Sequence, residues 1–435
     1  MDWKKHFEAN KVTAEEAAKK IKSGDGIVLT HASGEPGLLM KALKDRQNEI
    51  EGVTIFHGLS YGPGHHVAED LNPESVRHES MFVGSATRKS AADHRTYMKP
   101  MHFSDSYYNI KNGLIKCDVA AMHVSPPDRF GYCSFGVSCD YERIAVDTAK
   151  TVIAEVNPNM PYVFGKSFVH VSEIDYFIES NEPILTVAES VIGEKEEAIG
   201  KLIADEIPDG STLQIGVGAM PDAVMNFLSH REDLGIHTEM ITTGSKMLIE
   251  SGAVTNKYKN INTGVSVASF AGGTPELYEW LNENPMVEFW PIHYTNDART
   301  ISKIDNMMSV NSALEVDLMG QVCAEAIGIK QYSGIGGQMD FVRGATWAKG
   351  GKSFIALTST AKGGTVSRIS AALAPGTTVS TSRNDVDNIV TEYGIAALRG
   401  QTLPERAKRL IAVAHPDFRD QLREDFEKVY GFKLK

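Results

Sequence analysis

The feature of this sequence that most restricts its fold is the alternation of short apolar segments, rich in β-branched residues, with segments of helical pattern. A capping box formed by Thr13 and Glu16 predicts a helix that runs to about residue 22. Alternation of this kind is typical of an α/β fold with mostly parallel sheets, which we therefore predict. The apolar segments that indicate strands in the first half are 27–30, 53–57, 118–124 and 151–156.

The same order of elements occurs a second time along the chain. A turn at Asp25, a strand and a loop of small residues lead to Pro36, 11 residues after the aspartate. In the second half Asp209, a strand over 211–217 and a glycine turn lead to Pro221, 12 residues after the aspartate. The matching order and spacing predict two related open α/β domains.

The length of 435 residues fits two or three domains at roughly 150 residues each. The predicted boundary lies in the polar stretch that begins at residue 179, before a helix near Glu194. We therefore predict domains over 1–185 and 186–435. A helical tail over 403–427 is expected to close the second domain.

Composition excludes several classes of function. The chain has 44 Lys and Arg against 56 Asp and Glu, a net charge of −12, which argues against nucleic acid as a partner. The first residues lack the apolar core of a signal peptide, and no apolar run approaches the roughly 18–20 residues of a membrane span. The four cysteines contain no CxxC pair, so we expect free thiols and a cytoplasmic protein without a membrane partner.

A strand, a glycine turn and a helix are predicted over 213–224. Gly216 and Gly218 allow a ligand to approach the backbone closely, and Pro221 suits the first turn of a helix whose free N–H groups favour an anion. A tight turn without a ligand is the alternative. A dinucleotide-binding dehydrogenase is another, with Glu239 as the ribose-binding acid, although Pro221 stands where its third glycine is expected.

Two further constellations are candidates for chemistry. Glu239 lies near the end of the strand-like segment 235–241, where a carboxylate faces the ligand crevice of a doubly wound sheet. A structural pairing with a buried arginine is the alternative. Gly336 and Gly337, followed by Gln338, can present backbone N–H groups to an oxyanion, unless their segment is only a connector.

Histidine spacing gives no sign of a metal site. The 14 histidines include His65, His66 and His170, but no two of them have the spacing of a short metal-binding motif. We therefore predict no metal.

Several longer motifs extend over nearly the whole chain. They are SPPDRFGYCSFGVS (125–138), AEVNPNMP (154–161), FVHVSEID (168–175), GVGAMPDAV (216–224), GIHTEM (235–240), YSGIGGQMDFVRGA (332–345), TSRNDVD (381–387), VTEYGIA (390–396) and AHPDF (414–418). On these motifs the sequence resembles the acetyl-CoA hydrolase/transferase group of family I CoA-transferases, in particular the 4-hydroxybutyrate and butyryl-CoA:acetate CoA-transferases.

The resemblance implies a site and a reaction. It implies an active site in the cleft between the two domains, with Glu239 of the C-terminal domain as the nucleophile. It further implies a dimer or larger homo-oligomer, and CoA and acyl-CoA as substrates without a permanently bound cofactor. The residues that it implies for CoA binding are Gly216, Val217, Gly218, Ala219, Met220, Leu314, Gly336 and Gly337, with Gln338 beside them.

The expected activity is transfer of CoA between acetyl-CoA and a short-chain carboxylate, such as butyrate or 4-hydroxybutyrate, through a glutamyl-CoA thioester. An acyl-CoA hydrolase on the same scaffold and a non-catalytic CoA-binding regulator are the alternatives. The sequence departs from the family pattern at 242–246 and 272–275. These departures leave the acyl specificity open.

Overall fold

The computed structural model describes residues 2–62 and 64–434 and divides into two compact units. Unit 1 comprises Met1–Ala188, Glu239–Thr243 and Val267–Thr295, and unit 2 comprises Glu189–Thr238, Gly244–Ser266 and Asn296–Lys435. These units are defined by packing, so unit 1 includes two segments that come late in the sequence. The boundary after residue 185 stays a prediction. The units are described separately below.

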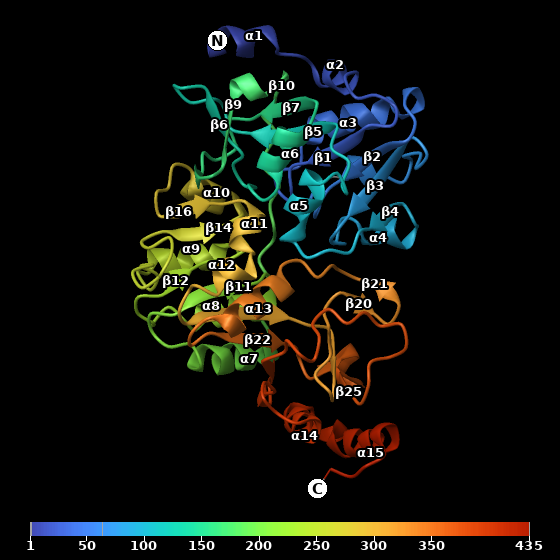
Figure 1. Cartoon of the computed structure of the whole chain (residues 1–435), viewed down its shortest axis with the longest axis vertical. Coiled ribbons are helices and arrows are strands. Elements are labelled where there is room, and N and C mark those ends of the chain that lie inside the picture. The colour runs from blue at the N-terminus through green and yellow to red at the C-terminus, as the bar shows by residue number, and fades with distance from the viewer. Residues whose placement is uncertain (1, 63, 435) are drawn as a thin grey trace. The chain divides into compact units, whose positions relative to one another are not determined.

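Unit 1 is built on a seven-stranded sheet with the order β10-β7-β5-β1-β2-β3-β4. All its neighbouring strands are parallel, as the sequence predicted, and they are drawn in blue to green in Figure 1. The predicted strand over 151–156 has those bounds in the structure. The strands are β1 (Gly26–Leu29), β2 (Val53–Phe56), β3 (Val76–Ser80), β4 (Thr96–Met98), β5 (Val119–Val124), β7 (Thr151–Val156) and β10 (Tyr176–Glu179).

Helices cover both faces of this sheet. Along β1, Ile27 and Leu29 belong to a core with the helices α2 and α3, whereas Val28 belongs to a core with α6. This follows from the period of two along a strand, which turns alternate side chains to opposite faces. The helices of unit 1 are α1 (Trp3–Ala9), α2 (Ala14–Ala18), α3 (Gly37–Asp45), α4 (Arg88–Ala92), α5 (Asp105–Lys111), α6 (Glu142–Thr148), α10 (Pro275–Leu281) and α11 (Ile292–Thr295), with short 3-10 turns η1 (Gln47–Glu49), η2 (His65–Val67) and η3 (Val171–Glu173).

Several short strands complete unit 1. The strands β6 and β9 form an antiparallel pair, and β13 pairs in parallel with β15. The strand β16 lies between β14 and β8 in a small sheet of three. Their bounds are β6 (Tyr132–Ser134), β8 (Phe164–Gly165), β9 (Phe168–His170), β13 (Met240–Ile241), β14 (Ser266–Ala268), β15 (Phe270–Ala271) and β16 (Val287–Phe289).

Unit 2 is built on a six-stranded sheet with the order β12-β11-β17-β22-β26-β27. Its strands are parallel except for the hairpin of β26 and β27. The strands are β11 (Thr212–Ile215), β12 (Gly235–Ile236), β17 (Met307–Ser312), β22 (Lys352–Ala356), β26 (Asn388–Thr391) and β27 (Gly394–Ala397). Short strands follow at β18 (Glu315–Asp317), β19 (Val322–Cys323), β20 (Ala326–Ile327), β21 (Lys330–Gln331), β23 (Thr360–Ala361), β24 (Val366–Ser367) and β25 (Ile369–Ser370).

The helices of unit 2 pack on this sheet. Ile355 of β22 and Ile389 of β26 share a core with Leu410 and Phe426, which lie on the last two helices, drawn in red in Figure 1. The helices are α7 (Glu194–Asp205), α8 (Ala219–Asn226), α9 (Thr243–Glu250), α12 (Ala298–Ile301), α13 (Gln338–Trp347), α14 (Leu403–Val413) and α15 (Arg419–Tyr430), with the 3-10 turns η4 (Lys362–Gly364) and η5 (Pro416–Phe418).

Two predicted helices differ from the observed ones at their ends. The capping box of Thr13 and Glu16 is confirmed, but α2 ends at Ala18, because the chain then turns toward β1. The single helical tail is two helices, since Pro416 interrupts the pattern and a proline cannot continue a helix.

The structure bears on the cysteines and on the apolar character of the helices. The four cysteines are free and buried. Among the residues that the structure describes, none of the helices combines the length and the apolar character that crossing a membrane requires.

Candidate active site

The carboxylate predicted to act as nucleophile, Glu239, lies in a turn between β12 and β13 and is half-buried. Its backbone carbonyl accepts hydrogen bonds from the N–H groups of Ser269, at 2.9 Å, and Phe270, at 3.2 Å. The predicted continuous strand over 235–241 is therefore wrong: the chain leaves β12 after Ile236 and begins a new pairing with β15 at Met240. This double anchoring fixes the backbone of Glu239.

Three groups of unit 1 experience the charge of Glu239. Burial lowers the pKa of His31 to about 4, although the charges of Glu142 and Glu239 act in the opposite direction. Burial, and next the charge of Glu239, raises the pKa of Asp140 well above its ordinary value. Burial also raises the pKa of Tyr61, with smaller contributions from Tyr278 and from Glu239. His31, Asp140 and Tyr61 therefore form the polar surroundings of the candidate nucleophile.

These surroundings are tightly connected. The ring nitrogen Nδ1 of His31 lies 3.1 Å from Oδ1 of Asp140, and both side chains are almost fully buried. The backbone N–H of His31 donates to Oε1 of Glu142 at 3.1 Å, and the Ser138 hydroxyl donates to the His31 carbonyl at 2.7 Å. The imidazole packs edge-on against the ring of Phe270, with 4.7 Å between centroids. His31 is thus held rigidly beside the segment that anchors Glu239.

Protonation reduces the negative charge around Glu239. Burial, and next the charge of Asp140, raises the pKa of Glu142 to about 8. The pKa of Asp140 is also raised and that of His31 is lowered, so burial favours the uncharged form of all three side chains. Uncharged forms of Asp140 and Glu142 would repel the Glu239 carboxylate less than two carboxylates do.

Another buried carboxyl group of unit 1, that of Glu155 on β7, lies beside the start of α3. Oε1 of Glu155 accepts a hydrogen bond from the Leu39 N–H at 2.7 Å, where a free amide of the helix needs a partner. Burial nevertheless raises the pKa of Glu155 to about 8, against the effect of the backbone N–H groups.

We expect Glu142 and Glu155 to make the folded state less stable as the pH rises from about 5 to 8. Their pKa values are raised to about 8, whereas the unfolded chain releases these protons near pH 4.5, so the folded state binds more protons at these two groups in this window. Each group contributes a slope of up to about 1.4 kcal/mol per pH unit. Below about pH 6.5 buried histidines with lowered pKa values, such as His31, act in the opposite direction, because only the unfolded chain binds their protons. The urea unfolding midpoints of Glu142→Gln and Glu155→Gln, measured at pH 5, 6, 7 and 8, should therefore each rise relative to that of the unaltered protein as the pH rises.

The exposed Glu232 provides the control for this measurement, since Glu232→Gln should keep the slope of the unaltered protein. A slope that stays the same in both buried variants would contradict the expected protonation.

A further carboxylate of unit 1, Glu35, is in a different environment. It accepts a hydrogen bond from the Ser60 hydroxyl at 2.9 Å, and its Oε1 lies 3.4 Å from Nδ1 of His66. Burial alone would raise the pKa of Glu35, but the histidines His66 and His57 and the Ser60 hydroxyl lower it to about 2. Glu35 is thus a buried and ionised carboxylate with one oxygen hydrogen-bonded to Ser60 and the other facing His66.

The glycine turn predicted to bind CoA lies in unit 2, directly after β11. The N–H of Gly216 donates to the Val310 carbonyl at 3.1 Å, and Val217 is half exposed. Gly218 has φ of 115°, a conformation that other residues rarely adopt, and it precedes the first residue of α8. The helix begins at Ala219, two residues before the predicted start at Pro221, so the amides of Ala219 and Met220 belong to its first turn.

The other predicted CoA-binding residues also belong to unit 2. Leu314 follows the end of β17, and because β11 and β17 are parallel neighbours, it lies at the same sheet edge as the glycine turn. Gly336 has φ of 54°, and Gly337 caps α13, which packs against β17 and β22. The side-chain amide of Gln338 donates to the Thr381 hydroxyl at 3.1 Å, so it supports the fold locally.

A buried network fixes this sheet edge. The Ser309 hydroxyl donates to Oε1 of Gln214 at 2.7 Å, and the Asn311 amide donates to the Ser309 hydroxyl at 2.9 Å and to Gln214 at 3.2 Å. Gln214 immediately precedes the last residue of β11, and Asn311 lies at the end of β17. The two strands that carry the glycine turn and Leu314 are therefore connected through side chains as well as through the backbone.

Comparison with known proteins identifies the family. The model of the acetyl-CoA hydrolase/transferase N-terminal domain matches residues 1–189, and that of the C-terminal domain matches residues 273–426. The chain belongs to the acetyl-CoA hydrolase/transferase family. The resemblance stated from the motifs is thereby confirmed.

Relatives within the acetyl-CoA hydrolase/transferase family match almost end to end. The 4-hydroxybutyrate coenzyme A transferase of Clostridium kluyveri is 47% identical, over 98% of this chain and 100% of its own. The butyryl-CoA:acetate CoA-transferase of Anaerostipes caccae is 39% identical, over 98% of both chains. The crystal structure of RipA from Yersinia pestis has a TM-score of 0.94 at 36% identity, covering 99% of this chain and 100% of that one.

The sequence did not reveal the residues that surround Glu239 in this family member. Asp140 and Glu142 directly follow the motif 125–138, and His31 opens the small-residue loop before Glu35, so each was close to a recognised segment. Their closeness to Glu239 depends on the pairing of β13 with β15, which no local pattern indicates.

Proposed function

We propose that this member of the acetyl-CoA hydrolase/transferase family is a CoA-transferase. It exchanges CoA between acetyl-CoA and a short-chain carboxylate of the butyrate or 4-hydroxybutyrate type. The observation that carries the proposal is the near full-length match to proteins named as CoA-transferases for these acids. The polar surroundings of Glu239 support its role as the nucleophile, because burial raises the pKa of the neighbouring acids Asp140 and Glu142 and so reduces the negative charge beside it.

The proposed reaction proceeds in two symmetrical halves. The Glu239 carboxylate attacks the acyl carbonyl of acyl-CoA, which forms a mixed anhydride and releases CoA thiolate. The thiolate attacks the glutamyl carbonyl, so a glutamyl-CoA thioester forms and the first carboxylate leaves. The acceptor carboxylate then attacks this thioester, and the released thiolate attacks the new acyl carbonyl. The products are a new acyl-CoA and the free Glu239 carboxylate.

The residues proposed for CoA binding are supported by the family resemblance and by the start of α8. Backbone N–H groups in the first turn of a helix favour anions such as the phosphates of CoA. Backbone amides at Gly336 and Gly337 are proposed as donors to the oxyanion that each addition step creates. The full set is Gly216, Val217, Gly218, Ala219, Met220, Leu314, Gly336 and Gly337.

The resemblance also supports a homodimer or larger homo-oligomer. The free, buried cysteines support a cytoplasmic location. All the steps above use only CoA, the two acids and the protein's own side chains and amides.

A covalent trap tests the proposed reaction. Sodium borohydride reduces a thioester, so we expect it to inactivate the enzyme irreversibly only after incubation with acetyl-CoA. Mass spectrometry should locate the reduced side chain at Glu239 in the peptide that contains it. Protein treated with borohydride in the absence of acetyl-CoA is the control, and it should keep its activity.

Steady-state kinetics provides the second arm of this test. A ping-pong pattern is expected for acetyl-CoA and the acceptor acid, since the first carboxylate leaves before the second one binds. A sequential pattern without a trapped glutamyl residue would contradict the proposal. Release of free thiol at the same rate with and without an acceptor acid would identify an acyl-CoA hydrolase instead.

A further inference from the structure

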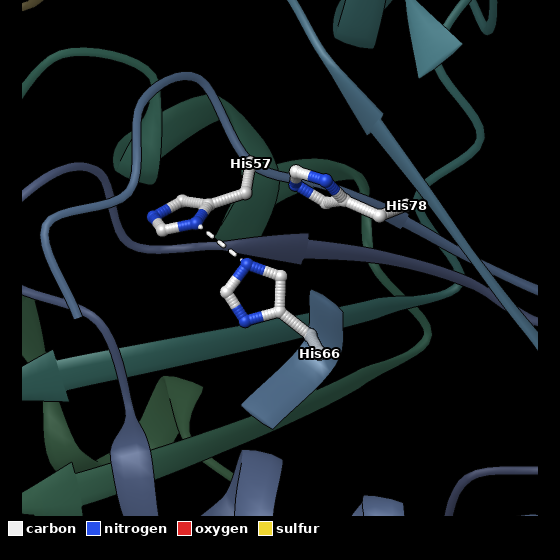
Figure 2. Close-up of side chains that lie close together, drawn as sticks. All are labelled: His57, His66 and His78. Atoms are coloured by element: carbon white, nitrogen blue, oxygen red, sulfur yellow. Dashed lines mark hydrogen bonds between the residues drawn. The ribbon is translucent and has the colours of Figure 1, made fainter. Parts of the chain in front are cut away.

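Three buried histidines of unit 1 converge on one point (Figure 2). His57 follows β2, His66 lies in the 3-10 turn η2, and His78 lies within β3. Each of them is at most 2% exposed. One nitrogen from each ring can be chosen so that all three lie within 4.8 Å of one another. Nothing in the proposed transfer reaction uses this cluster.

The neighbouring carboxylate of Glu35 determines the tautomer of His66. Oε1 of Glu35 lies 3.4 Å from Nδ1 of His66, and a carboxylate can only accept, so the proton of a neutral His66 ring is on Nδ1. Its other nitrogen, Nε2, then presents a lone pair toward the cluster, where it lies 3.3 Å from Nδ1 of His57. The dashed line in Figure 2 marks this contact.

A chain of hydroxyl groups fixes the tautomer of His78 in the same way. The Ser90 hydroxyl donates to the Thr87 carbonyl at 2.9 Å, so it must accept from the Thr96 hydroxyl, 2.6 Å away. The proton of Thr96 is thereby used, and its oxygen accepts from Nδ1 of His78 at 3.0 Å. Nε2 of His78 consequently carries a lone pair, and among the described residues it has no hydrogen-bond partner.

Without a ligand this arrangement leaves polar atoms unsatisfied. His57 can donate from Nδ1 to Nε2 of His66, but Nε2 of His57 and Nε2 of His78 then have no partner within the described structure. Burying polar atoms without partners is unfavourable, and such groups are rare in native proteins. A cation at the centre accepts all three inward lone pairs once the proton of His57 is on Nε2, and it thereby provides a partner for Nε2 of His78.

We propose that His57, His66 and His78 bind one divalent transition-metal ion, with zinc as the preferred ion. Zinc binds histidine nitrogens at about 2.0–2.1 Å, which places tetrahedral ligand atoms about 3.3 Å apart. The 3.3 Å between Nδ1 of His57 and Nε2 of His66 matches this separation, and the three ligand atoms all lie within 4.8 Å of one another. Three imidazoles are a donor set that suits zinc and exclude the oxygen-preferring ions calcium and magnesium.

The contacts behind the rings also support a metal at this position. Nδ1 of His78 donates to the Thr96 hydroxyl, and Nδ1 of His66 lies 3.4 Å from the Glu35 carboxylate. Such contacts on the outer nitrogens orient histidine ligands in metal proteins.

The ion would connect three separate parts of the chain. His57 and His66 bracket a loop that contains Ser60 and Tyr61, and Tyr61 is one of the groups that experience the charge of Glu239. Because His78 lies in β3, the ion would connect this loop to the seven-stranded sheet. The proposed metal therefore has a structural role, and its existence is independent of the CoA-transferase activity.

Metal binding to the complete, untagged protein tests the proposal directly. Protein purified in zinc-supplemented medium should contain one zinc per chain by elemental mass spectrometry. After removal of metal with a chelator, titration with Co²⁺ should produce visible absorption bands that saturate at one equivalent and disappear when Zn²⁺ is added. The unfolding temperature should rise with the concentration of Zn²⁺, because the ion binds the folded state.

Variants separate this cluster from adventitious surface binding. His66→Gln and His78→Gln should abolish the saturable Co²⁺ signal, whereas His65→Gln, at the partly exposed neighbour on the same turn, should retain it. Glu35→Gln should weaken zinc binding by about 10–100-fold, as loss of a contact behind a ligand does.

Two results would overturn the metal site. One is the absence of saturable one-to-one binding of Co²⁺ by the unaltered protein and by His65→Gln. This result would exclude the metal site even if the variants at the buried histidines do not fold. The other is an undiminished Co²⁺ signal in variants at His66 and His78 that are shown by circular dichroism to be folded.

Discussion

Replacing Glu239 by glutamine is expected to lower the rate of CoA transfer by several orders of magnitude, as loss of a nucleophile does in other covalent enzymes. The amide keeps the size of the side chain but lacks the anionic oxygen that attacks the thioester. CoA binding should persist, since the residues proposed for it are elsewhere in the sequence. Rates are measured on freshly purified protein, because deamidation of the glutamine would restore the carboxylate.

Shortening the same side chain provides an intermediate case. Glu239→Asp keeps the charge but withdraws the carboxylate by about 1.5 Å, and a misplacement of this size costs around 100-fold in rate. The two anchoring hydrogen bonds to the Glu239 carbonyl come from the backbone and should remain in both variants. The ordering Glu, then Asp, then Gln is therefore expected for kcat.

Two other glutamates serve as controls. The exposed Glu232→Gln should be fully active. Glu35→Gln should lower stability, since it removes the partner of Ser60 and His66, but its folded fraction should still transfer CoA. Normal turnover in Glu239→Gln together with an inactive, folded Glu35→Gln would assign the nucleophile to Glu35.

The second large effect is expected at Gly216. A methyl group added there would meet its nearest neighbour, the Val310 carbonyl, at 3.5 Å, which is ordinary contact, so Gly216→Ala should fold normally. If CoA approaches the backbone closely at this turn, the same methyl group will obstruct it. We expect KM for acyl-CoA to rise at least about tenfold, equivalent to about 1.4 kcal/mol of binding, with little change in kcat.

Calorimetric titration of CoA and the thermal unfolding of the same samples separate binding from stability. Gly37→Ala is the matched control, because a methyl group at Gly37 meets no atom within 4 Å and lies in a helix outside the predicted CoA segments. Unaltered CoA affinity in Gly216→Ala would remove the glycine turn from the proposed CoA site.

The regular parts of the fold were predictable because their signals are local. The strand over 151–156 is rich in β-branched residues, and the capping box at Thr13 needs only residues three positions apart. The glycine turn at 216–218 likewise follows from its own sequence. The family motifs supplied Glu239 itself.

What remained hidden depends on contacts between distant segments. The strand pattern over 235–241 is continuous in sequence, but its two ends pair with different strands, β11 and β15, so Glu239 lies in a turn. The three clustered histidines are separated by 9 and 12 residues, on a loop, a 3-10 turn and a strand. No short ligand motif results, which is why histidine spacing alone predicted no metal.

The make-up of unit 1 has a consequence for how the protein is synthesised. Met240, Phe270 and Ile292 belong to the same buried cluster as Phe56, although they are encoded far downstream. While the ribosome has delivered only the first 188 residues, this cluster lacks three of its apolar members, and the sheet beneath it stays partly uncovered. Unit 1 can therefore complete its core only after most of residues 189–295 have emerged from the ribosome. Until then it exposes apolar surface that is prone to aggregation and that chaperones would be suited to cover.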